Sequence, residues 1–183
     1  MRAKIALTGH TRGIGSSLYD FYLASGHEIR GFSKSNGYNL PDKIPQLLKE
    51  ADDCDVFINN AYSDGAQIVL LSNLWERWKG KDKIILNISS IRARYVKAPD
   101  PRYAAFKAGL DKMAKECLSR GPLPKILSVS PGVVDTVSNI NRAGPKLTID
   151  QAVKVIDWVL FNPIGALVSE ITFIHPEQQM TVG

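Results

Sequence analysis

Short apolar runs alternate with amphipathic stretches along almost the whole chain, and this alternation is the feature that most constrains the fold. The apolar runs have the length of buried strands, and the stretches between them have the length of helices. Strands separated by helices pair in parallel through right-handed crossovers. No repeat or linker divides the chain. We therefore expect one domain over residues 1–183, built as a three-layer α/β/α fold with a doubly wound parallel sheet.

The apolar runs predict strands over residues 4–7, 28–32, 56–59, 83–88, 126–129 and 171–174. The amphipathic stretches predict helices over residues 14–25, 41–51, 65–79, 101–120 and 149–161. Pro41 would occupy a favoured position in the first turn of its helix. Because ligands bind beyond the carboxyl ends of parallel strands, we expect the functional residues directly after strands.

Composition excludes several classes of protein. The formal net charge of +5 favours acidic partners, but the lysines and arginines are scattered, so we expect no nucleic-acid partner. No apolar run is long enough to span a bilayer or to form a signal peptide, and we expect a cytoplasmic protein without a membrane contact. Cys54 and Cys117 are far apart and form no CxxC pattern, which favours buried reduced thiols over a disulfide or a metal site.

A glycine-rich turn, Gly9 to Gly15, follows the first predicted strand at once. Its spacing is GxxxGxG, whereas the general dinucleotide fingerprint is GxGxxG. Glycines let a backbone turn sharply and approach a pyrophosphate, and the following helix directs free amides toward the anion. An ordinary strand–helix turn also contains glycine, so the turn needs support from the rest of the chain.

Tyr103 and Lys107 form a YxxxK motif on the predicted helix over residues 101–120. Residues four apart lie on one helix face, so both side chains can reach one ligand. A free tyrosine ionises near pH 10, and a neighbouring ammonium favours the phenolate and lowers that pKa. A tyrosine–lysine pair on the surface is the alternative interpretation.

These two motifs resemble those of the classical short-chain dehydrogenase/reductase family, whose cofactor turn is TGxxxGxG, and the chain would be an unusually short member. The resemblance implies a Rossmann-type fold and hydride transfer between a nicotinamide cofactor and a small-molecule carbonyl or alcohol. It implies that Tyr103 is the general acid or base and that Lys107 lowers the tyrosine pKa and holds the nicotinamide ribose. Ser90, thirteen positions before Tyr103, would orient the substrate oxygen, with Ser89 as the alternative.

The same resemblance implies a set of cofactor-binding residues around the strand ends. They are Gly9, Thr11, Arg12, Gly13, Ile14, Gly15, Ser33, Lys34, Asn39, Leu40, Asn60, Ala61, Tyr103, Lys107, Pro131, Gly132, Val133 and Thr136. Asn60 and Ala61 belong to a segment similar to the family's NNAG, in which Tyr62 replaces the glycine. Residues 131–136 are similar to the family's PGxxxT segment.

Charge at the second strand favours NADP over NAD. NAD-binding sites usually place an acid after this strand, about 20 residues past the glycine turn. This strand ends instead in Ser33 and Lys34, which can neutralise and hydrogen-bond a 2′-phosphate. Arg12 lies in the turn where NADP-preferring members of the family often carry a basic residue. Both cations could alternatively extend into solvent.

The chain departs from the family pattern before and after the catalytic helix. No residue matches the family's catalytic asparagine, whose place falls near residues 63–67. A short lid segment over residues 137–147 implies an open site, with Tyr95, Ile140 and Arg142 as candidate wall residues.

Arg92 and Arg94 follow Ser90 closely and could meet an anionic substrate, although arginines at such positions more often lie on the surface.

Two function classes remain open. The motifs favour an oxidoreductase, and the shortened chain favours a catalytically weak or inactive NADP(H)-binding sensor or scaffold. A sugar-nucleotide epimerase or dehydratase shares YxxxK but needs a larger C-terminal domain. Helices 65–79 and 101–120 carry wide apolar surface and pair across a dimer axis in the family, so we expect a homodimer or homotetramer; they could also pack only on their own sheet.

Overall fold

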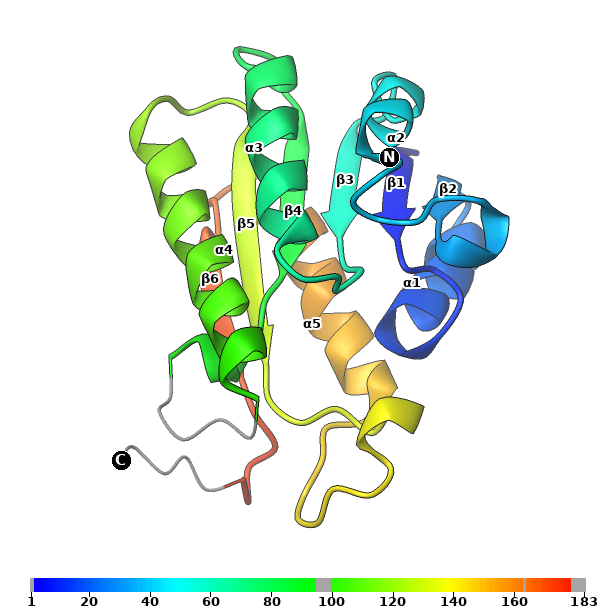
Figure 1. The fold of residues 1–183 in the computed structure, drawn as a ribbon, viewed down its shortest axis with the longest axis vertical. Helices are drawn as coiled ribbons and strands as arrows, with labels where there is room; N and C mark the ends of the chain where they lie inside the picture. Colours follow the sequence, from blue (N-terminus) through cyan, green and yellow to red (C-terminus); the bar gives the residue numbers. More distant parts are fainter. Residues whose placement is uncertain (1, 95–99, 163, 179–183) are drawn as a thin grey trace.

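The computed structural model describes residues 2–94, 100–162 and 164–178, which contain a six-stranded sheet with helices on both faces (Figure 1). The strands are β1 (Lys4–Thr8), β2 (Glu28–Phe32), β3 (Val56–Asn59), β4 (Ile84–Ile88), β5 (Lys125–Pro131) and β6 (Glu170–Phe173). The α-helices are α1 (Gly13–Ala24), α2 (Ile44–Glu50), α3 (Ala66–Trp78), α4 (Pro101–Ser119) and α5 (Ile149–Phe161). Three 3₁₀ turns complete the described elements: η1 (Lys34–Asn36), η2 (Ile91–Ala93) and η3 (Val137–Asn139). These elements confirm the predicted doubly wound α/β/α fold.

Every pair of neighbouring strands is parallel, and the strand order is β2-β1-β3-β4-β5-β6. The order reverses between β1 and β3, and such a switch point is where doubly wound sheets bind ligands. The common six-strand order of dinucleotide-binding folds is 3-2-1-4-5-6, with two strands beyond the first one. Here β2 alone lies beyond β1, and the short η1 occupies the segment that follows it.

The strand register aligns the carboxyl ends. Leu7 pairs with Ile58, Ile58 with Leu86, and Leu86 with Leu127. The segments that leave β1, β3, β4 and β5 therefore emerge side by side at one edge of the sheet.

Successive strand residues face opposite sides of the sheet, and each side has its own core. On one side Phe57 and Ile85 pack in a cluster with residues of α2, α3 and α4. Helix α3 contributes Leu70 and Trp78 to this cluster, and α4 contributes Leu110. A second cluster packs α1 and α5 against the other face of the strands. Both faces of the central strands are thus buried, which explains their continuous apolar runs.

The helix boundaries follow from local capping. Asp100 caps α4 by accepting hydrogen bonds from the backbone N–H groups of Arg102 and Tyr103. The predicted start of the second helix at Pro41 is wrong, because α2 begins at Ile44 and Pro45 occupies its first turn.

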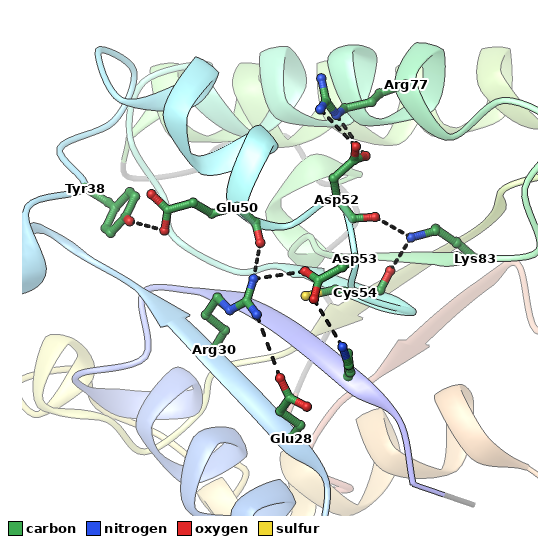
Figure 2. A network of polar contacts seen from close by, with 10 residues as sticks. Glu28, Arg30, Tyr38, Glu50, Asp52, Asp53, Cys54, Arg77 and Lys83 are labelled. Carbon is green, nitrogen blue, oxygen red and sulfur yellow. Dashed lines mark hydrogen bonds and ion pairs between the residues drawn. The ribbon is translucent and has the colours of Figure 1, made fainter.

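A polar network ties the amino-terminal half of the chain together away from the carboxyl ends of the strands (Figure 2). Arg77 binds both carboxylate oxygens of Asp52, and Arg30 contacts Asp53 at 3.0 Å. Lys83 Nζ donates to the backbone oxygens of Asp52 and Cys54. The segment before β3 is thereby fixed to β2, α3 and β4.

Among the helices of the described residues, none combines the length and the apolar character that a membrane span requires. Cys54 and Cys117 are buried free thiols.

Candidate active site

A cleft of about 740 Å³ lies across the carboxyl ends of the strands, a volume typical of small-molecule and cofactor sites. All the predicted site residues line it except Asn39. Those lining the cleft are Gly9, Thr11, Arg12, Gly13, Ile14, Gly15, Ser33, Lys34, Leu40, Asn60, Ala61, Ser90, Tyr103, Lys107, Pro131, Gly132, Val133 and Thr136. The side chain of Asn39 is exposed and instead donates to Asp42 at 3.4 Å.

The turn after β1 requires glycine at two positions for different reasons. Gly9 has a φ of +72°, a conformation that L side chains rarely adopt. A Cβ on Gly15 would lie 2.1 Å from the carbonyl oxygen of Gly9, closer than real atoms approach. The backbone of the turn is therefore packed on itself and open toward the cleft.

Asn60 joins this turn to the end of β3. Its Nδ2 donates to the backbone oxygen of Thr8 at 2.9 Å, and the Thr8 hydroxyl accepts from the backbone N–H groups of Asn60 and Ala61 at 2.9 and 3.0 Å. These bonds satisfy buried polar groups at the switch point of the sheet. Asn60 thus fixes the glycine turn to the end of β3, and its contact with a cofactor stays a prediction.

Ser90 and Tyr103 face the same cleft from β4 and α4. Ser90 is the second residue after β4 and caps η2 by accepting from the Arg92 backbone N–H at 3.2 Å. Burial raises the pKa of Tyr103, and hydrogen bonding to Ser90 together with the positive charges of Arg142 and Arg92 opposes that rise. The sequence-based argument assigned this lowering effect to Lys107. The structure assigns it to Ser90 and the two arginines.

Lys107 is 3% exposed, and its Nζ donates to Gln67 Oε1 at 2.7 Å and to the Ile88 backbone oxygen at 2.6 Å. Burial lowers its pKa to about 7, and the negative charge of Asp111 opposes the change. A neutral amine has two N–H groups, and both acceptors are present for them. The Nζ also lies 5.5 Å from the centre of the Tyr103 ring.

Gln67, which accepts a hydrogen bond from Lys107, is a buried polar residue that the sequence did not identify. It is 4% exposed at the start of α3, and its Nε2 donates to the backbone oxygens of Asn59 and Ile88 at 2.7 and 3.2 Å. The one indication in the sequence was that the family's catalytic asparagine was expected near residues 63–67, a range that includes Gln67. Glutamine is usually exposed, so a single sequence does not mark it as buried beside a lysine.

Tyr62, which stands where the NNAG pattern has glycine, contacts Tyr103. The rings of Tyr62 and Tyr103 lie edge to face with centroids 4.8 Å apart. Tyr38, which the sequence analysis also missed, lines the other end of the cleft and packs against Phe32.

The charged lining of the cleft has one sign. No Asp or Glu occurs among the lining residues that the structure describes, whereas the cations are Arg12, Lys34, Arg92, Lys107 and Arg142. Arg12 and Lys34 are exposed, and Ser33 hydrogen-bonds Ser35 between their hydroxyl oxygens at 2.8 Å. Such a cleft attracts anions.

The candidate wall residues and the two arginines expected to meet an anionic substrate divide into three groups. Arg92 and Arg142 line the cleft, whereas Arg94 turns away from it and pairs with Glu170 and Thr172 on β6. Ile140 is 68% exposed and is not part of the lining. Tyr95 lies outside the described residues.

The apolar stripes of α3 and α4 are largely used within the chain. Leu70, Leu71, Leu74, Trp75, Trp78 and Leu110 are all buried in the core on that side of the sheet. Phe106 and Met113 are partly buried. The stripes that led us to expect an oligomer are therefore accounted for by packing on the chain's own sheet, and the oligomer stays a prediction.

The similar proteins described below are dehydrogenases and reductases. No family model matches the sequence. The chain is similar to the 3-oxoacyl-[acyl-carrier-protein] reductase FabG of Chlamydia pneumoniae, with 24% identity over 185 residues, covering 73% of this chain and 74% of the relative. A short chain dehydrogenase from Burkholderia cenocepacia J2315, solved in complex with NADP, matches with a TM-score of 0.77 at 19% identity, covering 93% of this chain and 87% of that one. The 3-alpha-hydroxysteroid dehydrogenase from Pseudomonas sp. B-0831, complexed with NADH, matches with a TM-score of 0.73 at 17% identity, covering 94% and 95%. These structures share the fold of this chain.

Proposed function

We propose that this chain is a short-chain dehydrogenase/reductase and an NADP(H)-dependent oxidoreductase acting on a carbonyl or alcohol. The observation that carries the proposal is the convergence of Ser90, Tyr103 and Lys107 on the cleft that the glycine turn also lines. The similar proteins include a 3-oxoacyl-[acyl-carrier-protein] reductase and a 3-alpha-hydroxysteroid dehydrogenase. Their names give different substrates, so the similarity does not identify the substrate of this chain.

The residues of the cleft fit a nicotinamide dinucleotide. The close packing at Gly9 and Gly15 disfavours side chains there, and α1 begins within this motif at Gly13, which suits a pyrophosphate site at the start of a helix. Solved structures with this fold contain NADP in one case and NADH in another. The exposed cations Arg12 and Lys34, without an acid in the lining that the structure describes, support NADP for this chain.

When bound, the nicotinamide supplies or accepts the hydride. Ser90 Oγ hydrogen-bonds the substrate oxygen, and Tyr103 Oη donates its proton to that oxygen as the carbonyl carbon is reduced. Burial raises the pKa of Tyr103 from its ordinary value, so the phenol keeps the proton that it would donate to the substrate oxygen. Ser90, Arg92 and Arg142, whose hydrogen bond and positive charges oppose the rise in the Tyr103 pKa, would stabilise the phenolate that remains.

A second candidate function is an NADP(H)-binding sensor or scaffold. The position of Tyr62 favours it, because an aromatic ring packs on the catalytic tyrosine where the family pattern has glycine. The intact set of Ser90, Tyr103 and Lys107 favours the enzyme.

The test is NADPH oxidation, followed by absorbance, against a panel of ketones, aldehydes and quinones. We expect turnover of at least one compound, and Tyr103→Phe should reduce kcat by about 10²- to 10⁴-fold because the general acid is lost. Tyr19→Phe, on α1 and outside the cleft lining, is the control and should retain activity. NADPH binding without turnover of any compound would favour the sensor and contradict the enzyme.

A further inference from the structure

Two arginines lie on the part of the cleft that contains the catalytic tyrosine. Arg92 belongs to η2, directly after Ser90, and Arg142 belongs to the segment between η3 and α5. Both line the cleft together with Tyr103, and the charges of both act on its hydroxyl. Two guanidinium groups from separate segments are thus brought to the reaction centre.

Neither guanidinium has an acidic partner among the residues that the structure describes. Met1, residues 95–99, Pro163 and residues 179–183, which complete the chain, contain no Asp or Glu. Other arginines do have partners: Arg30 and Arg77 bind carboxylates in the network of Figure 2, and Arg94 binds Glu170. Arg30, Arg77 and Arg94 thus have a counter-charge, whereas Arg92 and Arg142, which line the cleft, have none among the described residues.

This arrangement costs free energy unless an anion binds. Burial and the neighbouring Arg142 charge lower the pKa of Arg92, which means that its charged form is disfavoured where it stands. Guanidinium groups present paired N–H donors that match carboxylate and phosphate oxygens. An oxoanion between the two arginines would remove the repulsion and satisfy these donors.

The two arginines are separate from the cations expected to meet the cofactor. Arg12 lies in the turn after β1, and Lys34 lies after β2. Arg92 lies after β4, in the same segment as Ser90. Arg142 lies beyond β5 and beyond the segment similar to PGxxxT. The order of the strands thus places one pair of cations on each side of the switch point.

We propose that Arg92 and Arg142 bind an oxoanion of the substrate, so that the substrate is a carbonyl compound carrying a carboxylate or a phosphate ester. This proposal rests on the proposed reductase function. It assigns substrate selection to the two arginines and proton donation to Tyr103. The same pair would hold the substrate with its carbonyl toward Ser90.

Matched substrates test the proposal. NADPH oxidation is measured with 2-oxo and 3-oxo acids against their methyl esters, and with dihydroxyacetone phosphate against dihydroxyacetone. We expect kcat/KM to be at least about tenfold higher for one anionic member, since a charge-assisted hydrogen bond contributes about 1.5–3 kcal/mol. A preference for the oxo acids over their methyl esters would identify the anion as a carboxylate. A preference for dihydroxyacetone phosphate over dihydroxyacetone would identify it as a phosphate ester. Equal kcat/KM within both pairs would overturn the proposal and leave the reductase function standing.

Variants assign the effect to the two residues. Arg92→Met and Arg142→Met should each lower kcat/KM for the preferred anion by at least about tenfold more than for its neutral partner, because the neutral substrate loses only the stabilisation of the Tyr103 phenolate. Arg102→Met removes an exposed arginine next to Tyr103 that pairs with Asp64, and it should change neither. A loss shared equally by the anionic and neutral substrates would contradict the assignment.

A binding measurement separates this proposal from the reductase function. Malonate and inorganic phosphate are titrated calorimetrically into the wild type and Arg92→Met. Binding to the wild type that Arg92→Met weakens by about tenfold supports the anion site even if no carbonyl compound is reduced, in which case the reductase function fails alone. Absence of binding, or equal binding to both proteins, contradicts the anion site.

Discussion

Lys107 and Gln67 show how single residues set the chemistry of the cleft. The lysine is buried beside two oxygen acceptors, and its pKa falls to about 7 because burial disfavours the ammonium. At neutral pH the amine therefore exchanges a proton readily next to Tyr103. Gln67 holds this amine in place and is itself fixed by the end of β3.

This pKa predicts how stability depends on pH. Between about pH 7 and the ordinary lysine pKa of 10.5 the unfolded chain binds a proton at Lys107 that the folded chain lacks, so unfolding becomes less favourable as pH rises. Relative to Lys107→Met, the free energy of unfolding of the wild type should increase across this window, with a slope approaching about 1.4 kcal/mol per pH unit. Urea denaturation of both proteins at several pH values measures the difference. Parallel pH profiles would show that Lys107 keeps its ordinary pKa.

Single residues were predictable from the sequence where a motif fixes the backbone or the spacing. The cleft is lined by the glycine turn and Ser90, which follow strand ends, and by Tyr103 and Lys107. The last two lie one helical turn apart on α4, as the YxxxK spacing predicted. Asn39 does not, because its side chain turns to Asp42. The contact of Gln67 with Lys107 and the pairing of Arg94 with Glu170 on β6 both join segments that are distant in the sequence. A single sequence does not reveal such contacts.

At the scale of elements, the junction of β1 and α1 depends on close packing of the turn on itself. Gly15 lies within α1, and a side chain there would meet the carbonyl oxygen of Gly9 and the amide of Asn60. The packing of the turn by itself therefore requires glycine at position 15.

Gly15→Ala should lower the free energy of unfolding by about 1–3 kcal/mol, the usual cost of overpacking, and abolish measurable NADPH binding. Gly121→Ala is the matched control, because a Cβ at Gly121 has open space around it. Thermal unfolding and fluorescence titration with NADPH measure both effects. Retained NADPH affinity in Gly15→Ala would show that the turn does not hold the cofactor.

Alternation of apolar and amphipathic stretches was sufficient to predict all the strands and α-helices, with errors at their ends. The start of α2 was misplaced because two prolines, Pro41 and Pro45, offer the same first-turn signal. The strand order was not predictable, because pairing beyond the switch point depends on packing rather than on local pattern.

Over the whole molecule, charge is distributed unevenly. The network of Figure 2 pairs cations with carboxylates away from the cleft, whereas the cleft lining that the structure describes contains cations alone. A dinucleotide with an additional phosphate gains most from such a surface.

Lys34→Ala should therefore raise the Kd for NADPH by about three- to tenfold, a modest factor because the side chain is exposed, and leave the Kd for NADH within about twofold. Lys49→Ala, an exposed lysine of α2 outside the cleft lining, is the control. Fluorescence titration at low and high salt measures both constants. Equal wild-type affinities for NADPH and NADH would contradict the NADP preference.

The central claim is that Ser90, Tyr103 and Lys107 meet where a bound dinucleotide ends. A crystal structure of the protein with NADPH tests it most directly. The account predicts electron density for the pyrophosphate at the glycine turn and for the nicotinamide beside Tyr103 and Lys107. A dinucleotide bound elsewhere, or a saturating soak that leaves the cleft empty, would contradict it.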